Sequence, residues 1–252
     1  MPEPAQPHSP SDSPTTRWSL VLAAADRGGD RALAQQALAQ LCQMYWRPVL
    51  QFILRRGYSE ADAKDLTQDF FLRFSEAAFL QKAHARYGRF RALLFSALKH
   101  LLCDKADERG AQKRGGGLEI VSLEEWMRSD GVGAGPSDPS TAQAQQAFDY
   151  DWAALVVRNA LGRLQDGFAA RGKVRQFEVL RSFLSAGEKG SAYADAASEL
   201  SVRPGTVKAM VHRLRGEYGG LLREEVAQTL ADERDLDDEV RHLCRILADR
   251  QP

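Results

Sequence analysis

Residues 62–74 of the chain read DAKDLTQDFFLRF. At about 100° per residue, a helix places four apolar residues of this stretch on one stripe, namely Ala63, Leu66, Phe70 and Phe74. The same helix lines up three acids on another face, namely Asp62, Asp65 and Asp69. The stretch therefore predicts an amphipathic helix whose aromatic side anchors a helical core. Its acidic face is either a solvated surface or a docking site for a basic partner.

The charge of the chain is balanced in total but uneven along its length. The 252 residues include 34 Lys and Arg and 34 Asp and Glu, so the formal net charge is zero. Residues 86–114 hold eight basic against three acidic residues, whereas residues 224–249 hold nine acidic and three basic residues. The sequence thus combines a basic middle with an acidic tail, and only the basic middle favours a polyanionic partner.

The cysteines and histidines give no sign of a metal centre. Cys42, Cys103 and Cys244 are odd in number and far apart, without ligand spacing. The histidines likewise show no metal-binding pattern, so we expect neither a metal nor another cofactor. The N-terminus lacks a basic start followed by an apolar run, and no window approaches the ~20 apolar residues of a membrane helix. We therefore expect a cytoplasmic protein without a membrane partner.

The pattern of apolar residues predicts an all-α fold of two helical domains joined by a flexible linker. Residues 1–14 are rich in Pro and Ser and are expected to be disordered. Residues 15–114 form the predicted N-terminal helical domain. Residues 115–147 are rich in Gly and form the predicted linker. Residues 148–230 form the second domain, and residues 231–252 an acidic helical extension.

Residues 191–215 carry a helix-turn-helix signature. A short Ala-rich helix is followed by a turn at Ser201 and Val202, and a new helix begins at Pro204, where the missing N–H costs nothing. The buried positions are expected to be Ala196, Leu200, Val202, Val207, Val211 and Leu214. The outward face is mostly cationic and suits a DNA major groove, although a helical hairpin with solvated charges remains the alternative. Arg203 is a poor N-cap for the second helix.

The basic segment at residues 86–114 is a second candidate for nucleic-acid binding. Aromatic and Arg side chains alternate from Arg86 to Arg91, ahead of a helix with an apolar side and a basic side. Bases stack on planar side chains while cations contact phosphates, so this pattern is typical of single-stranded DNA binding. A solvated basic face over a core explains the pattern equally well.

Together these segments resemble the bacterial RNA polymerase sigma factors of the sigma-70 family, in particular the small extracytoplasmic-function (ECF) group with two domains. Residues 57–74 are similar to the clamp-binding helix, whose usual run is Asp-Ala-Glu-Asp, an aliphatic residue, Gln, an acid, and aromatic or aliphatic residues. Residues 90–114 resemble the promoter-melting and -10-reading segment, and residues 192–215 resemble the -35-reading helix-turn-helix. The three motifs occur in the family's order.

The resemblance implies a protein that is not an enzyme but binds core RNA polymerase and directs it to promoter DNA. Asp62, Asp65 and Asp69 would dock on the basic coiled coil of the polymerase β′ clamp. The residues that would contact the -10 element are Arg91, Lys99, His100, Asp104, Arg109, Lys113 and Arg114. The residues that would contact the -35 element are Arg203, Thr206, Lys208, His212, Arg213 and Arg215. His100 stands where the family often has Asn, so the base preference is open.

Two residues of the opening stretch depart from the family pattern. Lys64 replaces an acid, which weakens docking on a basic clamp, and Thr67 replaces an aliphatic residue. Some members of the family replace a missing acid by phosphorylating a Thr, which would add about two negative charges beside Lys64. We hypothesise that a Ser/Thr kinase activates the protein at Thr67. The alternative is that Thr67 only fills a position at the edge of the apolar stripe.

Other functional classes remain open at this stage. A helix-turn-helix regulator could bind an operator without polymerase, and the first half lacks the alternating β-α pattern of a receiver domain that would favour it. A helical metal-dependent phosphohydrolase is disfavoured by the histidine spacing. The amphipathic helix of the extension is either docked on its own domain or acts as a self-inhibiting or partner-binding helix. An anti-sigma factor cannot be identified from the sequence.

Overall fold

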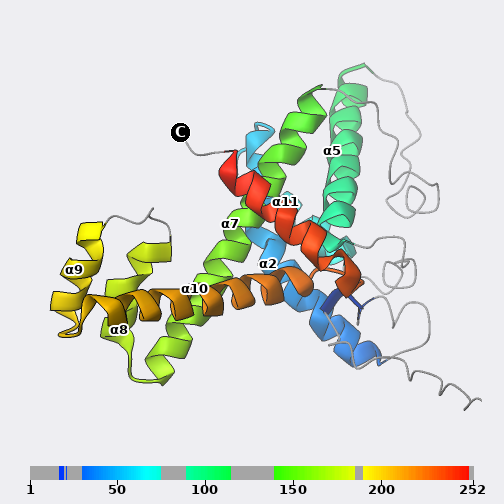
Figure 1. The fold of residues 1–252 in the computed structure, drawn as a ribbon. Coiled ribbons are helices and arrows are strands. Elements are labelled where there is room, and N and C mark those ends of the chain that lie inside the picture. Colours follow the sequence, from blue (N-terminus) through cyan, green and yellow to red (C-terminus); the bar gives the residue numbers. More distant parts are fainter. Residues whose placement is uncertain are drawn as a thin grey trace, which may run out of the picture. The chain divides into compact units, whose positions relative to one another are not determined.

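The computed structural model describes residues 17–19, 21, 30–74, 89–114, 139–184 and 190–249. Within them, the side chains of residues 103–114, 139–141 and 190–191 are not described. The predicted N-terminal disordered lead and most of the predicted linker lie outside the described residues. Among the described residues the secondary structure is helical, with one isolated β-bridge and no named strand. The all-α fold predicted from the sequence is confirmed to this extent (Figure 1).

The first helices of the described chain are α2 (Arg31–Arg55), α3 (Glu60–Phe74) and α5 (Phe90–Arg114). The later elements are α7 (Pro139–Ala170), α8 (Val174–Leu180), the 3-10 turn η1 (Arg181–Leu184), α9 (Gly190–Glu199), α10 (Pro204–Ala227), the 3-10 turn η2 (Glu233–Asp235) and α11 (Leu236–Ala248). α7 begins at Pro139, inside the segment predicted as linker.

Short-range signals set the ends of the early helices. Asp30 Oδ1 accepts hydrogen bonds from the N–H groups of Ala32 and Leu33, at 2.9 and 3.2 Å, and so caps α2. α2 runs on through Pro48 and ends at Arg55, and the turn that follows contains Gly57, whose φ of 84° lies in the left-handed region that favours glycine. α2 and α3 are therefore separate helices joined by a short turn.

The contacts between residues divide the chain into two compact units. Unit 1 comprises residues 1–43, 71–132 and 229–235, and unit 2 comprises residues 44–70, 133–228 and 236–252. Each unit is thus built from segments that are distant in the sequence. The two predicted domains, residues 15–114 and 148–230, stay a prediction.

The described core of unit 1 is aromatic. Phe90, the first residue of α5, packs edge-on against Trp18 and Phe74, with ring centroids 5.1 and 5.7 Å apart. All three rings are fully buried. Such edge-to-face pairs add about 0.5–1.5 kcal/mol beyond their burial, so the N-terminal end of α5 is a well-packed point of this unit.

Unit 2 is organised along α7. Near its beginning, Phe148 packs edge-on against Phe52 of α2, with ring centroids 6.0 Å apart. One turn later, Asp151 accepts two hydrogen bonds from the Arg55 guanidinium, at 2.6 and 2.9 Å. This bidentate geometry is the strongest form of a carboxylate–Arg pair. α7 also packs against α8, α10 and α11 (Figure 1).

The C-terminal helix α11 packs on α7 and α10, as an amphipathic extension docked on its own unit would. Its Leu243 is 1% exposed, and its His242 ring lies stacked on Trp152 of α7 at 6.3 Å. At the other end, Arg223 of α10 pairs with Asp237 at 2.6 Å. No helix within the described part of the chain is long and apolar enough to cross a membrane.

Candidate nucleic-acid interface

In unit 2, α9 and α10 are joined by a tight turn, as the helix-turn-helix predicted from the sequence requires. Val202 N–H donates to Ala197 O at 2.9 Å and Leu200 N–H to Ala196 O at 3.0 Å, which closes the end of α9. Ser201 has a φ of 55°, a left-handed conformation that costs a non-glycine residue about 1 kcal/mol. The turn therefore holds its shape against a small backbone strain.

The start of α10 follows from the residues around Pro204. Arg203 is extended, with φ −78° and ψ 146°, as expected before a proline. Its side chain makes no capping hydrogen bond, which agrees with its assignment as a poor N-cap. Pro204 occupies the first turn, where its missing N–H leaves no partner unsatisfied. The N–H groups of Thr206 and Val207 donate to Arg203 O, at 2.9 and 3.3 Å, so the first turn of α10 is bonded within the chain.

A compact apolar core fixes α10 against α7, α8 and α9. It consists of Leu164, Phe168, Phe177, Leu180, Phe183, Tyr193, Ala196, Ala197, Val207, Val211 and Leu214. Four of the six positions predicted to be buried belong to it, while Leu200 and Val202 pack against it partly exposed. With one side of α10 buried in this way, the opposite side is free to face a ligand.

All six residues predicted to contact the -35 element are exposed in α10 or just before it, namely Arg203, Thr206, Lys208, His212, Arg213 and Arg215. Two of them also have contacts inside the protein. The Lys208 ammonium lies 5.8 Å from the centroid of the Tyr193 ring. The Arg215 guanidinium donates to Phe183 O at 3.0 and 3.2 Å, so Arg215 ties α10 to η1. Arg215 thus has a structural partner besides any DNA contact.

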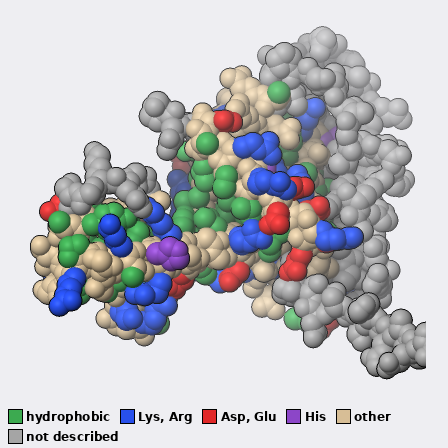
Figure 2. Space-filling view, viewed as in Figure 1, with side chains coloured by type: hydrophobic (Ala, Val, Ile, Leu, Met, Phe, Trp, Pro, Cys, Tyr) green, Lys and Arg blue, Asp and Glu red, His purple; other side chains and the backbone are tan. Residues whose placement is uncertain are grey.

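Sequence reasoning missed a second group of cations beside the helix-turn-helix, Arg171, Lys173, Arg175 and Arg181, which are all exposed. Gly172, with a φ of 69°, ends α7 and turns the chain into this group. Between residues 171 and 215, the described residues include eight Lys and Arg against three Asp and Glu. Figure 2 shows Lys and Arg side chains spread over the lobe of α8, α9 and α10. The signal was present in the sequence as RGKVR at residues 171–175.

The residues predicted to contact the -10 element are placed less favourably. Arg91 is only 5% exposed, because it lies on the same side of α5 as the fully buried Leu94 and Leu98. In this conformation it offers DNA almost no surface. Lys99 and His100 are half-buried. Asp104, Arg109, Lys113 and Arg114 belong to α5, but their side chains lie outside the described residues.

The acidic face of α3 is accessible, although its charges have local partners. Asp62 and Asp65 are exposed and Asp69 is half-buried. Ser59 Oγ donates to Asp62 Oδ2 at 2.8 Å and accepts from Asp62 N–H at 3.1 Å, so Ser59 caps the start of α3. Lys64 Nζ pairs with Glu60 at 2.7 Å, and this hydrogen bond lowers the pKa of the Glu60 carboxyl. Lys64 is thus paired within its own helix.

Thr67 lies in the core and not at its edge. Its side chain is fully buried, and its hydroxyl donates to Ala63 O at 2.6 Å. Leu66, which the sequence placed on the apolar stripe, is half-buried. The stripe of α3 is therefore centred on Ala63, Thr67, Phe70 and Phe74, at the spacing i, i+4, i+7 and i+11. A kinase cannot reach the Thr67 hydroxyl in this conformation.

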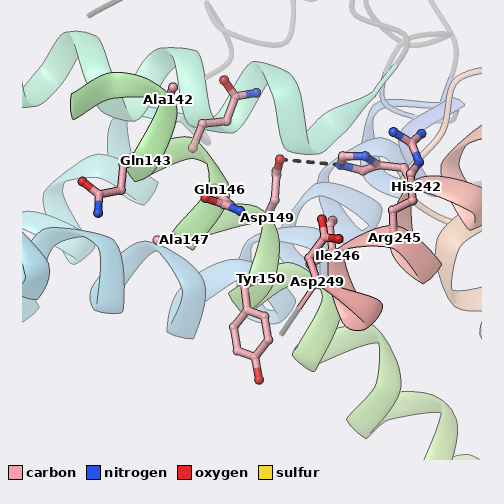
Figure 3. A pocket seen from close by; sticks show the side chains of 11 residues that line it. Ala142, Gln143, Gln146, Ala147, Asp149, Tyr150, His242, Arg245, Ile246 and Asp249 are labelled. Atoms are coloured by element: carbon pink, nitrogen blue, oxygen red, sulfur yellow. Dashed lines mark ion pairs between the residues drawn. The ribbon is translucent and has the colours of Figure 1, made fainter. Parts of the chain in front are cut away.

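A cavity of about 580 Å³ lies between the first turns of α7 and the C-terminal half of α11 (Figure 3). His242 Nε2 faces Asp149 Oδ2 across 3.5 Å, which is longer than a hydrogen bond. Gln143, Gln146 and Arg245 add polar groups to the wall. Among the residues the structure describes, no cluster of His, Cys, Asp or Glu could hold a metal ion.

Comparison with known proteins adds no further assignment. No model of a protein family matches the chain, and no curated protein or solved structure matches it either.

Proposed function

We propose that the chain is an ECF-type sigma factor, which binds core RNA polymerase and directs it to specific promoters in the cytoplasm. The observation that carries this proposal is the cationic face of α10. All six residues predicted to read the -35 element are exposed there, while Val207, Val211 and Leu214 of the same helix are buried. A helix held in this way can enter a major groove with its N-terminal half.

The chemistry of the α10 face fits duplex DNA. Arg213 can donate two parallel hydrogen bonds to the O6 and N7 acceptors of guanine, and Thr206 can bond to bases or phosphates. The exposed cations of residues 171–181 add charge that attracts the phosphate backbone. A duplex -35 element is therefore the ligand that this lobe suits best.

Two further features support polymerase and -10 binding, and both rest on the resemblance to the sigma-70 family. α3 presents Asp62 and Asp65 to solvent on one face, as docking on a basic coiled coil requires. α5 is a long helix whose sequence holds the basic residues of the predicted -10 reader. The predicted phosphorylation of Thr67 remains part of the proposal only if α3 first opens, since its hydroxyl is buried.

Run-off transcription tests the proposal. Core RNA polymerase is combined with the purified chain on fragmented DNA from the source organism, and the transcripts are sequenced to find the promoters. We expect defined start sites that depend on the chain. Arg213→Ala should lower transcription by about 5- to 150-fold, because a bidentate base contact is worth about 1–3 kcal/mol. Arg158→Ala, an exposed Arg of α7 outside the helix-turn-helix, serves as the control.

The main alternative is a regulator that binds an operator without polymerase. In that case the purified chain would bind specific duplex DNA tightly by itself, and added core polymerase would not change its affinity. Promoter-specific initiation that needs both proteins excludes this alternative. If the chain directs no initiation with core polymerase but binds specific duplex DNA tightly by itself, the operator-binding regulator replaces the sigma factor as the proposed function.

A further inference from the structure

The segment between α10 and α11 is bound to the beginning of α5. Phe90 N–H donates to Thr229 O at 3.0 Å, and Arg89 and Leu230 form an antiparallel β-bridge. Leu230 is fully buried and Thr229 is 2% exposed. The chain leaves unit 2 at Gln228, contributes residues 229–235 to unit 1, and returns to unit 2 at Leu236. Residues near the C-terminus of the sequence thus bind the beginning of α5, which comes from the middle of the sequence.

The bound segment sits where the predicted -10 reader begins. The first N–H groups of a helix need partners from outside the helix, and Thr229 O supplies one for Phe90. Phe90 itself is fully buried against Trp18 and Phe74, and Arg91 follows at 5% exposure. The contact therefore belongs to the packed core at the beginning of α5.

The segment is held from both sides by helices of unit 2. Before it, α10 is fixed to α7 because Arg163 donates to both Glu224 and Glu225, at 2.6 and 3.0 Å. After it, α11 is docked through buried Leu243 and through the ring of His242 on Trp152. Residues 229–235 are thus a short strap with two anchored ends.

We propose that Thr229–Asp235 acts as an autoinhibitory strap that holds the beginning of α5, the predicted -10 reader, in a closed form. This inference rests on the proposed role of α5 in promoter recognition. Release of the strap would remove the Thr229 bond and the Leu230 anchor together, and the first turn of α5 would then be able to change its conformation. Engagement of polymerase and promoter is the event that this release would accompany.

A reversible crosslink tests the strap within one protein. Residues opposite each other in an antiparallel bridge have Cα atoms about 4.5–5.5 Å apart, which suits a disulfide. Arg89→Cys and Leu230→Cys are combined, with the exposed Cys244 replaced by Ser. Run-off transcription with core polymerase is measured for the oxidised form and again after reduction. Leu230→Cys alone, in the same background, is the control for oxidation and for loss of the Leu side chain.

The strap predicts at least a tenfold loss of transcript in the oxidised double variant and its recovery on reduction, with no effect of oxidation on the single variant. Equal transcription before and after reduction would overturn the inference, because the strap would then stay closed during initiation. Absence of transcription from the wild-type chain would instead count against the sigma-factor proposal itself.

A structural readout completes the test without polymerase. Hydrogen exchange of a peptide spanning residues 89–95 should speed up in Leu230→Asp, since the Phe90 amide loses its partner. Glu233→Ala changes an exposed residue of the same segment and should leave exchange unchanged. Unchanged exchange in Leu230→Asp would show that the segment does not protect α5, and would also overturn the inference.

Discussion

Replacing Thr67 by Asp tests whether α3 can accept a negative charge where the sequence suggested a phosphosite. The side chain is fully buried, and its hydroxyl bonds only to Ala63 O of the preceding turn. A carboxylate at this position would be cut off from water without a cation among its known partners. Burying an uncompensated charge costs about 3–5 kcal/mol, so Thr67→Asp should either destabilise the protein by this amount or open α3.

Thr67→Val separates this charge effect from the loss of the hydroxyl. Val keeps nearly the same shape and removes one hydrogen bond, which is worth about 0.5–1.5 kcal/mol net. Because Thr hydroxyls that bond back to the preceding turn strain a helix slightly, the cost should lie at the low end of that range. Gln68→Glu is the charge control, since it adds one negative charge at an exposed position of the same helix.

Thermal unfolding followed by circular dichroism measures these differences. For a chain of this size, 1 kcal/mol corresponds to roughly 2–4 °C in Tm, so Thr67→Asp should melt about 6–12 °C or more below Gln68→Glu. Hydrogen exchange of α3 would show whether the loss is local. A Thr67→Asp protein that melts within a few degrees of Gln68→Glu would refute the burial argument. It would also restore Thr67 as an accessible phosphosite.

Three further predictions follow from the described contacts. Arg213→Ala should impair promoter recognition without a change in Tm. Arg215→Ala should impair promoter recognition and also lower Tm, because the Arg215 guanidinium donates to Phe183 O. Thermal unfolding and run-off transcription of the two variants test this difference. Arg163→Ala should lower the free energy of unfolding by about 1–2 kcal/mol, since it leaves the buried carboxylate of α10 with one weak donor, and urea titration measures it. Iodoacetamide at pH 8 should label the exposed Cys244 but spare Cys42, because burial raises the pKa of the Cys42 thiol to about 12 and keeps it protonated; peptide mass spectrometry checks this.

The helix-turn-helix could be predicted from the sequence because its signals are local. Pro204 marks the start of a helix by its own chemistry, and the period of Val207, Val211 and Leu214 assigns the buried side without knowledge of any neighbour. The caps at Asp30 and Ser59 are local in the same sense, since each side chain bonds an N–H group within three residues. Local chemistry therefore predicted the elements and the exposed face of α10.

The burial of Thr67 and Arg91 could not be predicted in the same way. A helical period gives the angle between side chains on one helix, but it does not tell how wide the covered stripe is. Thr67 was assigned to the edge of that stripe and lies at its centre, because Phe70 and Phe74 follow it at i+3 and i+7. The bridge between Arg89 and Leu230 joins residues 141 positions apart, and the spacing of apolar residues within a helix cannot predict a pairing over such a distance.

The single helix α7 connects two of the proposed functions within unit 2. Its first half is held to α2 by the Arg55–Asp151 pair, next to the helix that bears the predicted polymerase dock. Its second half carries Leu164 and Phe168 into the core that supports α10. At 1.5 Å per residue, about 20 Å of uninterrupted helix separates Asp151 from Leu164. α7 therefore packs in its first half against α2 and in its second half within the core that supports α10.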